Sequence, residues 1–341
     1  MIKPRTKQSG VAIIMAMLIV ALATSVAAFA AWQQNLWLRQ AESLSSQAMA
    51  LAASRTALTL GREVLAEDVR NNQVDHLDEP WAKYALVTPA DGGGSVAGKI
   101  ADQQGLFNVN NLAATDPTQQ ALALQWFEAL LTALDLPQPA ALAEALKDYI
   151  DQDDQGPFED LNYLGKAEPY RTANTALQSI DELNRVQGFT TDVIKKLRPF
   201  ISAIPVFGPL APGGITPPIA TTPINVNTAP VEVLNAVFGS SAGAAIVTER
   251  EKKFFGDPAD FDTRTATLLP PVDPNNPAKH PWTFPGAATG AGNIDIKSDY
   301  FLLSAVSQFE RTQFGLLALV KREAAGTNPP TNIIWQQQTI D

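Results

Sequence analysis

The sequence predicts an α+β protein in which a long N-terminal helix precedes strands that flank a block of helices. Two observations predict this fold. No proline interrupts the 341-residue chain between Gly10 and Glu79, so one helix can extend through that stretch. Strand-like segments occur near residues 96–112 and again at 300–338, and the segments between them have helical patterns. This order predicts a frame of strands that is split by an inserted, helix-rich domain.

The N-terminal helix is expected to begin as a membrane segment. Residues 11–31 are apolar, and no charged residue occurs between Lys7 and Arg39. Such a run can cross a bilayer, which needs roughly 20 residues, whereas a cleaved signal peptide has an apolar core of about 7–15. Cleavage near Ala28 or Ala31 is an alternative because small residues lie there. Basic residues before the run predict a cytoplasmic N-terminus, with the rest of the chain outside.

Beyond the apolar run the helix is expected to become amphipathic. Four leucines recur every seven residues: Leu44, Leu51, Leu58 and Leu65. This spacing keeps the side chains on one face of a helix. The pattern favours one helix of about fifty residues, half apolar and half amphipathic. An anchor followed by a separate amphipathic helix is the alternative.

Local signals place the remaining elements. Asp116-Pro117 is a start signal for a helix at 118–136, and Ser179 with Glu182 forms a capping pattern for another helix at 179–189. Proline-rich segments are expected to be loops. The other expected elements are helices at 139–150, 190–198 and 241–254, a strand, turn and helix within 224–238, loops at 204–223 and 267–293, and strands at 300–309, 314–323 and 331–338.

Composition and charge exclude several classes of function. The chain has no cysteine, which excludes disulfides, thiolate metal sites and a cysteine nucleophile. Its net charge of -10 is unsuited to nucleic acid, whose phosphates need a basic surface. It contains no HExxH, G-x-S-x-G or phosphate-loop motif. The sequence therefore predicts a protein that is not an enzyme and does not bind nucleic acid.

The stretch from residue 148 to residue 168 has the chemistry of a binding site. It contains seven carboxylates: Asp148, Asp151, Asp153, Asp154, Glu159, Asp160 and Glu168. Calcium takes about six to eight oxygen ligands, and several carboxylates on one flexible loop can supply them. An EF-hand is excluded because Gln155 and Asn162 stand at two of its ligand positions. The residues alone leave a solvated acidic loop and a calcium site as alternatives.

The basic leader, the apolar run and the continuing helix resemble the N-terminus of type IV pilin-like proteins. In that family a prepilin peptidase cuts a short basic leader after its last glycine and methylates the new N-terminus. Here "RTKQSG" is followed by "VAIIM", so the resemblance implies cleavage between Gly10 and Val11 and N-methylation of Val11. Residues 1–10 would be the leader, and residues 11–31 the membrane part of the long helix. Met15 departs from the family pattern, because most members carry a glutamate there.

The rest of the chain narrows the resemblance to the K-type minor pseudopilin of the type II secretion system. The segments that carry it are "DQQGLFNVNNL", "LKDYIDQDD", "EPYRTANTALQSIDELNRVQGF", "INVNTAPVEVLNAVF" and "SDYFLLSAV". The resemblance implies a type IV pilin-like fold, with a long N-terminal helix packed on an antiparallel sheet and a large inserted helical domain. The expected parts are 32–112 for the first part of the pilin-like core, 113–223 for the inserted domain with its acidic loop and proline-rich linker, and 224–341 for a second helical segment and the strands that complete the core.

The K-type resemblance also implies a cofactor. Members of the family bind calcium in the helical domain, and Asp151, Asp153 and Glu168 stand in the matching motif. A structural Ca2+ is therefore expected at these residues. Three neighbouring carboxylates are further candidate ligands: Asp154, Glu159 and Asp160.

Met15 and the family resemblance together imply a place at the filament tip. In pilin-like filaments the missing glutamate pairs with the N-terminus of the neighbouring subunit, and a tip subunit lacks that neighbour. An unpaired carboxylate is costly in a bilayer, so an apolar residue such as Met15 suits the tip. The implied protein is anchored in the inner membrane by a single span, with its globular part in the periplasm. It caps the pseudopilus together with I- and J-type minor pseudopilins, above the major pseudopilin filament, and supports pseudopilus initiation and the export of folded proteins across the outer membrane.

The leucine stripe from Leu44 to Leu65 is the candidate surface for packing the long helix against these partners, although part of it must serve the protein's own core. An alternative function rests on residues 224–254, which also resemble the helix-hairpin-helix repeat of DNA-uptake proteins. That would make the chain a membrane-anchored DNA receptor. The hairpin "VFGSSAG" lacks the usual Gly-x-Gly, and the acidic charge of the chain disfavours phosphate binding.

Overall fold

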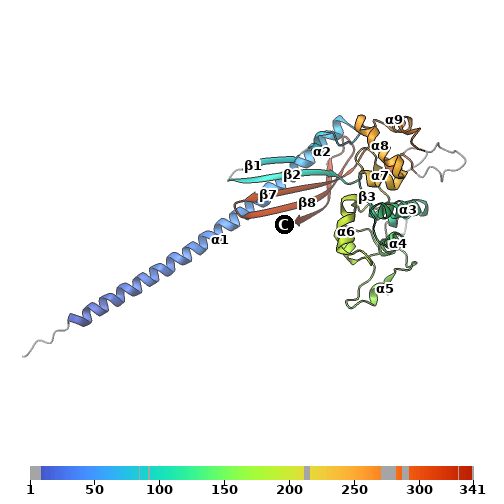
Figure 1. Cartoon of the computed structure of the whole chain (residues 1–341). Coiled ribbons are helices and arrows are strands. Elements are labelled where there is room, and N and C mark those ends of the chain that lie inside the picture. The colour runs from blue at the N-terminus through green and yellow to red at the C-terminus, as the bar shows by residue number, and fades with distance from the viewer. Residues whose placement is uncertain are drawn as a thin grey trace, which may run out of the picture.

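The free part of the long helix, the sheet on which the rest of that helix packs, and the block of short helices follow one another along the molecule (Figure 1). The computed structural model describes residues 9–83, 85–90, 93–210, 216–269, 282–285, 292–328 and 330–339, without the side chains of residues 9 and 85–90. Leader residues 1–8 and most of the predicted loop at 267–293 lie outside these ranges. The predicted α+β fold class is confirmed, because a long helix packs on an antiparallel sheet and a helical block is inserted between its strands.

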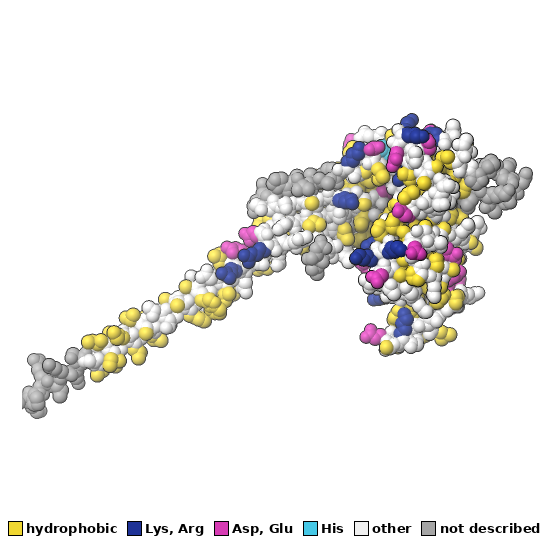
Figure 2. Space-filling view, viewed as in Figure 1, with side chains coloured by type: hydrophobic (Ala, Val, Ile, Leu, Met, Phe, Trp, Pro, Cys, Tyr) yellow, Lys and Arg dark blue, Asp and Glu magenta, His cyan; other side chains and the backbone are white. Residues whose placement is uncertain are grey.

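Helix α1 (Ser9–Asn71) is one continuous element of 63 residues. It is longer than the expected fifty residues, and at about 1.5 Å per residue it extends for about 95 Å. Residues 10–45 are exposed, and the helix first becomes buried at Ser46. Figure 2 shows hydrophobic side chains along this free part and charges of both signs where the helix reaches the sheet. It is the one helix in the described residues that is long and apolar enough to cross a membrane.

The sheet has five strands in the order β1-β2-β7-β8-β9, and all neighbouring strands are antiparallel. The strands are β1 (Ala85–Ala90), β2 (Gly94–Asp102), β7 (Tyr300–Phe309), β8 (Thr312–Arg322) and β9 (Thr331–Thr339). The short helix α2 (Pro80–Lys83) leads into β1. Strands β7, β8 and β9 confirm the three predicted C-terminal strands. Strand β1 was not predicted, and its Pro89 fits an edge strand because proline cannot donate to a second neighbour.

The second half of α1 packs on one face of the sheet. Leu58 and Leu65 are buried against Phe301 and Leu303 of β7. The packing is close at Gly61, where an added Cβ would lie 3.0 Å from a methyl carbon of Leu303. Two polar contacts also fix the helix: Ser54 Oγ lies 2.9 Å from Ser307 Oγ, and Arg62 Nε donates to Thr331 Oγ1 at 2.9 Å. Leu58 and Leu65 therefore belong to the protein's own core.

The helical block lies between β2 and β7 in the chain. Its helices are α3 (Pro117–Ala133), α4 (Pro139–Ile150), α5 (Asp160–Leu164), α6 (Thr191–Leu197), α7 (Val231–Phe238), α8 (Ser240–Lys252) and α9 (Pro258–Thr265), with 3₁₀ helices at Val109–Ala113, Ile180–Arg185 and Arg198–Phe200. Two short parallel pairs join distant segments: β3 (Phe107–Asn108) with β4 (Ile201–Ser202), and β5 (Ile224–Asn225) with β6 (Ile294–Asp295). Helices on both sides of the proline-rich segment share one hydrophobic core.

Local signals placed most of these helices. The Asp116 carboxylate accepts from the Thr118 and Gln119 amides, so it is the predicted N-cap of α3. The capping box of Ser179 and Glu182 is also present. The element that follows it is a 3₁₀ helix ending at Arg185, so the prediction of a helix as far as residue 189 was wrong. Helices α5 and α9 were not predicted.

Candidate metal centre

The acidic loop between α4 and α5 brings three carboxylates together. Asp151 follows the last residue of α4, and Glu159 immediately precedes α5. One carboxylate oxygen each of Asp151, Asp153 and Glu159 lie within 4.8 Å of one another. Two ligands on opposite sides of Ca2+, each at about 2.3–2.6 Å, are about 4.6–5.2 Å apart. One ion could therefore contact all three residues.

The unpaired oxygens of this loop fit a cation. Both carboxylate oxygens of Asp151 and both of Glu159 are buried without a hydrogen-bond partner among the described residues. Burial raises the pKa of Asp151 to about 7; the charge of Lys147 opposes this rise, and those of Asp153 and other nearby carboxylates add to it. Lys147 Nζ lies 3.7 Å from Asp151 Oδ2, too far for a hydrogen bond. Buried carboxylates without donors are costly, and a bound divalent cation would remove that cost.

The loop is built around Asp148, which is fully buried. Its Oδ2 accepts from the Phe158 amide at 2.9 Å, and its Oδ1 accepts from Lys147 Nζ at 3.1 Å. The chain passes so close that a Cβ on Gly156 would lie 2.1 Å from Asp148 Oδ2. Gly156 is therefore needed because of this close approach, and Asp148 holds the two ends of the loop together.

The structure groups only some of the predicted ligands. Asp151 and Asp153 lie together, and Glu159 completes their group. Asp154 and Glu168 are exposed and outside it. Asp160 is engaged elsewhere, because its Oδ1 accepts from the amide and the hydroxyl of Thr172, both at 2.9 Å. The metal site itself stays a prediction.

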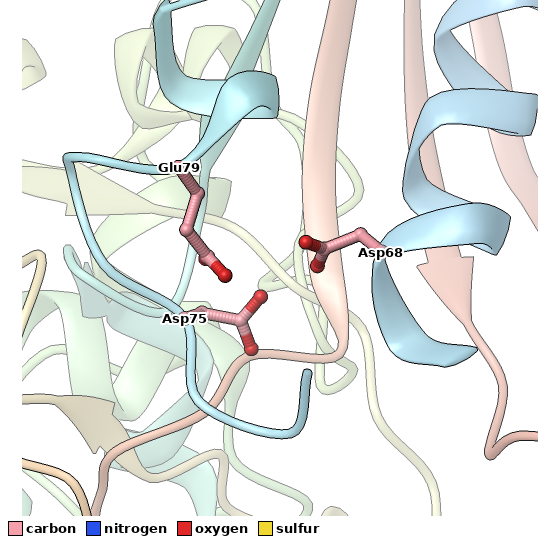
Figure 3. A group of neighbouring side chains, drawn as sticks. All are labelled: Asp68, Asp75 and Glu79. Carbon is pink, nitrogen blue, oxygen red and sulfur yellow. The ribbon is translucent and has the colours of Figure 1, made fainter. Parts of the chain in front are cut away.

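A second group of carboxylates, which the sequence did not point to, lies where α1 ends. Figure 3 shows the side chains of Asp68, Asp75 and Glu79 facing one another, and one oxygen from each lies within 4.8 Å of the others. Arg322, at the end of β8, donates to Oδ2 of Asp68 at 2.5 Å and to Oδ2 of Asp75 at 2.6 Å. No local pattern could reveal this group, because Arg322 is more than 240 residues away in sequence.

Burial dominates the electrostatics of this second group. It raises the pKa of Asp75 to about 7, against the opposing charge of Arg322. Burial, with the negative charge of Glu79, raises the pKa of Asp68 to about 6. Glu79 has three donors: Asn72 Nδ2 at 2.5 Å, the His76 amide at 3.0 Å and Trp81 Nε1 at 2.7 Å. Hydrogen bonds from the protein therefore satisfy the Glu79 carboxylate, whereas Oδ1 of Asp75 has no hydrogen-bond partner in the part of the chain that the structure describes.

The other predicted functional residues lie on the free part of α1. Val11 and Met15 are exposed, and a Cβ on Gly10 would have no neighbour within 4 Å in the described ranges. The leucine stripe divides at the edge of the sheet: Leu44 is 66% exposed, whereas Leu51 packs partly against the core. Of the four leucines, only Leu44 is left free for a contact with another protein.

Comparisons with known proteins agree over most of the chain. Two family models, both described as "Type II secretion system (T2SS), protein K", match residues 105–206 and 224–278. Type II secretion system protein K of Pseudomonas aeruginosa is 31% identical over 91% of this chain and 87% of its own length. The protein of the same name from Pectobacterium carotovorum subsp. carotovorum is 28% identical over 86% of this chain and 91% of its own length.

A solved structure is similar over the same range. It comes from the GspK-GspI-GspJ complex of the enterotoxigenic Escherichia coli type 2 secretion system. The match covers 89% of this chain and 100% of that chain, with a TM-score of 0.71 and 25% sequence identity. The second family match includes α7 and α8, the helices that also resembled a DNA-binding hairpin.

Proposed function

Because this chain belongs to the protein K family of the type II secretion system and is a minor pseudopilin, we propose that it caps the tip of the periplasmic pseudopilus. In this role it supports pseudopilus initiation and the export of folded proteins across the outer membrane. It acts as a structural component without catalysis. Before assembly, α1 anchors it in the inner membrane by a single span, with the N-terminus in the cytoplasm and the globular part in the periplasm.

The observation that carries this proposal is the shape of the molecule. Residues 10–45 of α1 are free along their whole length, and all the globular mass lies beyond them (Figure 1). A free apolar helix can pack into the helix bundle of a filament. The helical block extends beyond the sheet at the end remote from the N-terminus, where it would obstruct a subunit stacked above. A tip position avoids that clash.

Met15 supports the same place in the filament. It is exposed on the free helix, at the position where most pilin-like proteins carry a glutamate. A carboxylate in a membrane-embedded helix is costly unless it is paired. Because a tip subunit has no neighbour above it to supply the pairing charge, an apolar side chain is favourable there.

The proposed partners are I- and J-type minor pseudopilins, with the major pseudopilin filament below. The support is the similarity to the K protein of the GspK-GspI-GspJ complex. We expect Leu44→Cys, carrying a cysteine-reactive photo-cross-linker, to trap an I- or J-type partner, because Leu44 is exposed on the free helix. Leu58→Cys is the matched control, since Leu58 belongs to the same stripe but is buried against the sheet. Equal trapping from both positions, or none from Leu44, would argue against contact through this face.

The proposal includes a structural calcium ion in the helical block. Asp151, Asp153 and Glu159 would hold it, and the unpartnered oxygens of Asp151 and Glu159 support the assignment. The ion would neutralise the loop and join the end of α4 to the start of α5. It would stabilise the fold without taking part in a reaction.

Calcium should raise the melting temperature of the chelator-treated protein, because a ligand that binds only the folded state stabilises it by about 2.7 kcal/mol at a concentration 100 times Kd. Asp151→Asn should make this rise smaller in a thermal melt, because it removes a ligand of the loop site. Asp154→Asn is the matched control, because it removes a neighbouring carboxylate that lies outside the group. The site is rejected if calcium has no effect on the parent, or if both variants respond as the parent does.

A further inference from the structure

The three carboxylates of Asp68, Asp75 and Glu79 lie where the end of α1, the segment that follows it and the helical block meet. Asp68 is in the last turns of α1, and the other two residues are on the segment that connects α1 to α2 (Figure 3). The Asp75 amide donates to the carbonyl of Ile296, and Asn225 Nδ2 donates to the carbonyl of Asp75. His76 stacks on Phe254 of the helical block, with ring centroids 3.8 Å apart. Whatever binds the group therefore fixes how α1 meets the helical block.

We propose that this group is a second divalent-cation site, of the oxygen-ligand type that suits Ca2+, with Asp75 Oδ1 as its buried ligand. It is distinct from the loop between α4 and α5, and it does not depend on that loop binding calcium. The proposal rests on the partners of Asp75, the charge balance of the group and the space beside it.

Asp75 is the residue that points to a ligand. It is 1% exposed, and its Oδ2 accepts from the Ser298 amide and from Arg322. Its Oδ1 has no partner among the described residues, although the carboxyl group faces Asp68 and Glu79. A buried oxygen of a charged group normally has a donor or a metal ion beside it.

The charge balance also favours a divalent cation. Three carboxylates face one guanidinium, that of Arg322, which leaves an excess of two negative charges when all are ionised. Arg322 contacts Oδ2 of both aspartates, so it does not occupy Oδ1 of Asp75. One carboxylate oxygen from each of the three residues lies within 4.8 Å of the others, and Ca2+ can bridge ligands about that far apart.

There is room for the remaining ligands. A pocket of about 530 Å³ opens beside the group, and Asp68 and Glu79 form part of its wall. Asn71 and Asn72 also line it. Waters in this pocket could complete the about six to eight ligands that calcium needs, since three carboxylates alone do not.

The test uses the full chain in detergent, after chelator treatment, in an Asp151→Asn/Glu159→Gln background that removes two carboxylates of the loop site. Calorimetric titration with Ca2+ should still show one ion bound per chain. No binding in this background would overturn the proposal. Asp75→Asn should then abolish the remaining event, whereas Asp78→Asn should not, because Asp78 is exposed and pairs with Lys83 outside the group. A folded Asp75→Asn variant that still binds the ion would also overturn it.

A second measurement keeps the group intact, in case Asp75→Asn does not fold. Trp81 Nε1 donates to Glu79 Oε2, so an ion bound to Glu79 lies close to an indole ring. Tb3+ added to the Asp151→Asn/Glu159→Gln protein should emit on excitation that tryptophan absorbs, and excess Ca2+ should quench this emission by displacement. Bound Tb3+ without tryptophan-sensitised emission would place the ion elsewhere and overturn the proposal.

Discussion

Arg322→Met should destabilise the protein by about 3–5 kcal/mol, because it removes one partner of a buried ion pair and leaves the other without its partner. Arg322 is buried and joins Asp68 of α1 to Asp75 of the following segment. It also donates to the Ser298 carbonyl at 2.7 Å. Without it, the buried Asp75 and the half-buried Asp68 would face Glu79 without the positive charge of Arg322. The loss in the free energy of unfolding is measured by urea denaturation of the detergent-solubilised chain in a chelator, with tryptophan fluorescence as the signal.

Lys321→Met is the matched control for that substitution. It removes the same charge from the neighbouring position, where Lys321 is more exposed and pairs with Glu323 at 3.1 Å. Such surface pairs contribute about 0–1 kcal/mol. Equal losses in the two variants would mean that the Arg322 contacts contribute no more than a surface pair. Ca2+ bound to the carboxylates that lose Arg322 would offset part of the loss of stability. Both variants are therefore compared in a chelator.

Gly10→Ala should block removal of the leader almost completely if the chain is processed as a prepilin. The peptidase would recognise the glycine that precedes the apolar helix, and the new N-terminus would be Val11. The structure makes this substitution a clean test, because a Cβ on Gly10 has no described residue within 4 Å that it would disturb. Mass spectrometry of the purified chain measures both outcomes: the parent should begin with N-methylated Val11, and the variant should keep its leader.

Ser9→Ala is the control for processing, because it changes the adjacent residue and leaves the glycine in place. It should be cleaved as the parent is. A parent chain whose N-terminus lies beyond Val11, for example near Ala28, would instead indicate signal-peptide cleavage and remove the anchor from the mature protein. Normal processing of Gly10→Ala would show that the predicted cut is wrong.

Local patterns predicted much of the fold. The proline-free stretch predicted α1, and the caps at Asp116 and Ser179 placed the starts of two helical elements correctly. The strand-like segments at 300–309, 314–323 and 331–338 correspond to β7, β8 and β9. Patterns could not tell a 3₁₀ helix from an α-helix after Ser179, since the same capping box serves both. They also missed α9, where Asp257 caps a helix of only eight residues beside the proline-rich loop.

The candidate sites were predictable only in part. Asp151 and Asp153 are close in sequence, so a short motif could suggest both. Glu159 joins them because the loop turns back around buried Asp148, and neither the turn nor the burial is visible in the sequence. The sequence did not reveal the group of Asp68, Asp75 and Glu79. Its carboxylates come from the end of α1 and the segment after it, whereas its arginine, Arg322, comes from the C-terminal part of the sheet. Long-range packing creates that site.

The most direct test of the tip assignment is to locate the protein on assembled pseudopili. The chain has no cysteine, so a single Asp192→Cys substitution, at an exposed position in α6 of the helical block, gives one attachment point for a gold label. Electron microscopy of labelled filaments should show gold at one end only, with far fewer copies of this chain than of the major subunit. Gold spaced regularly along the filaments would contradict the proposal that this protein caps the tip.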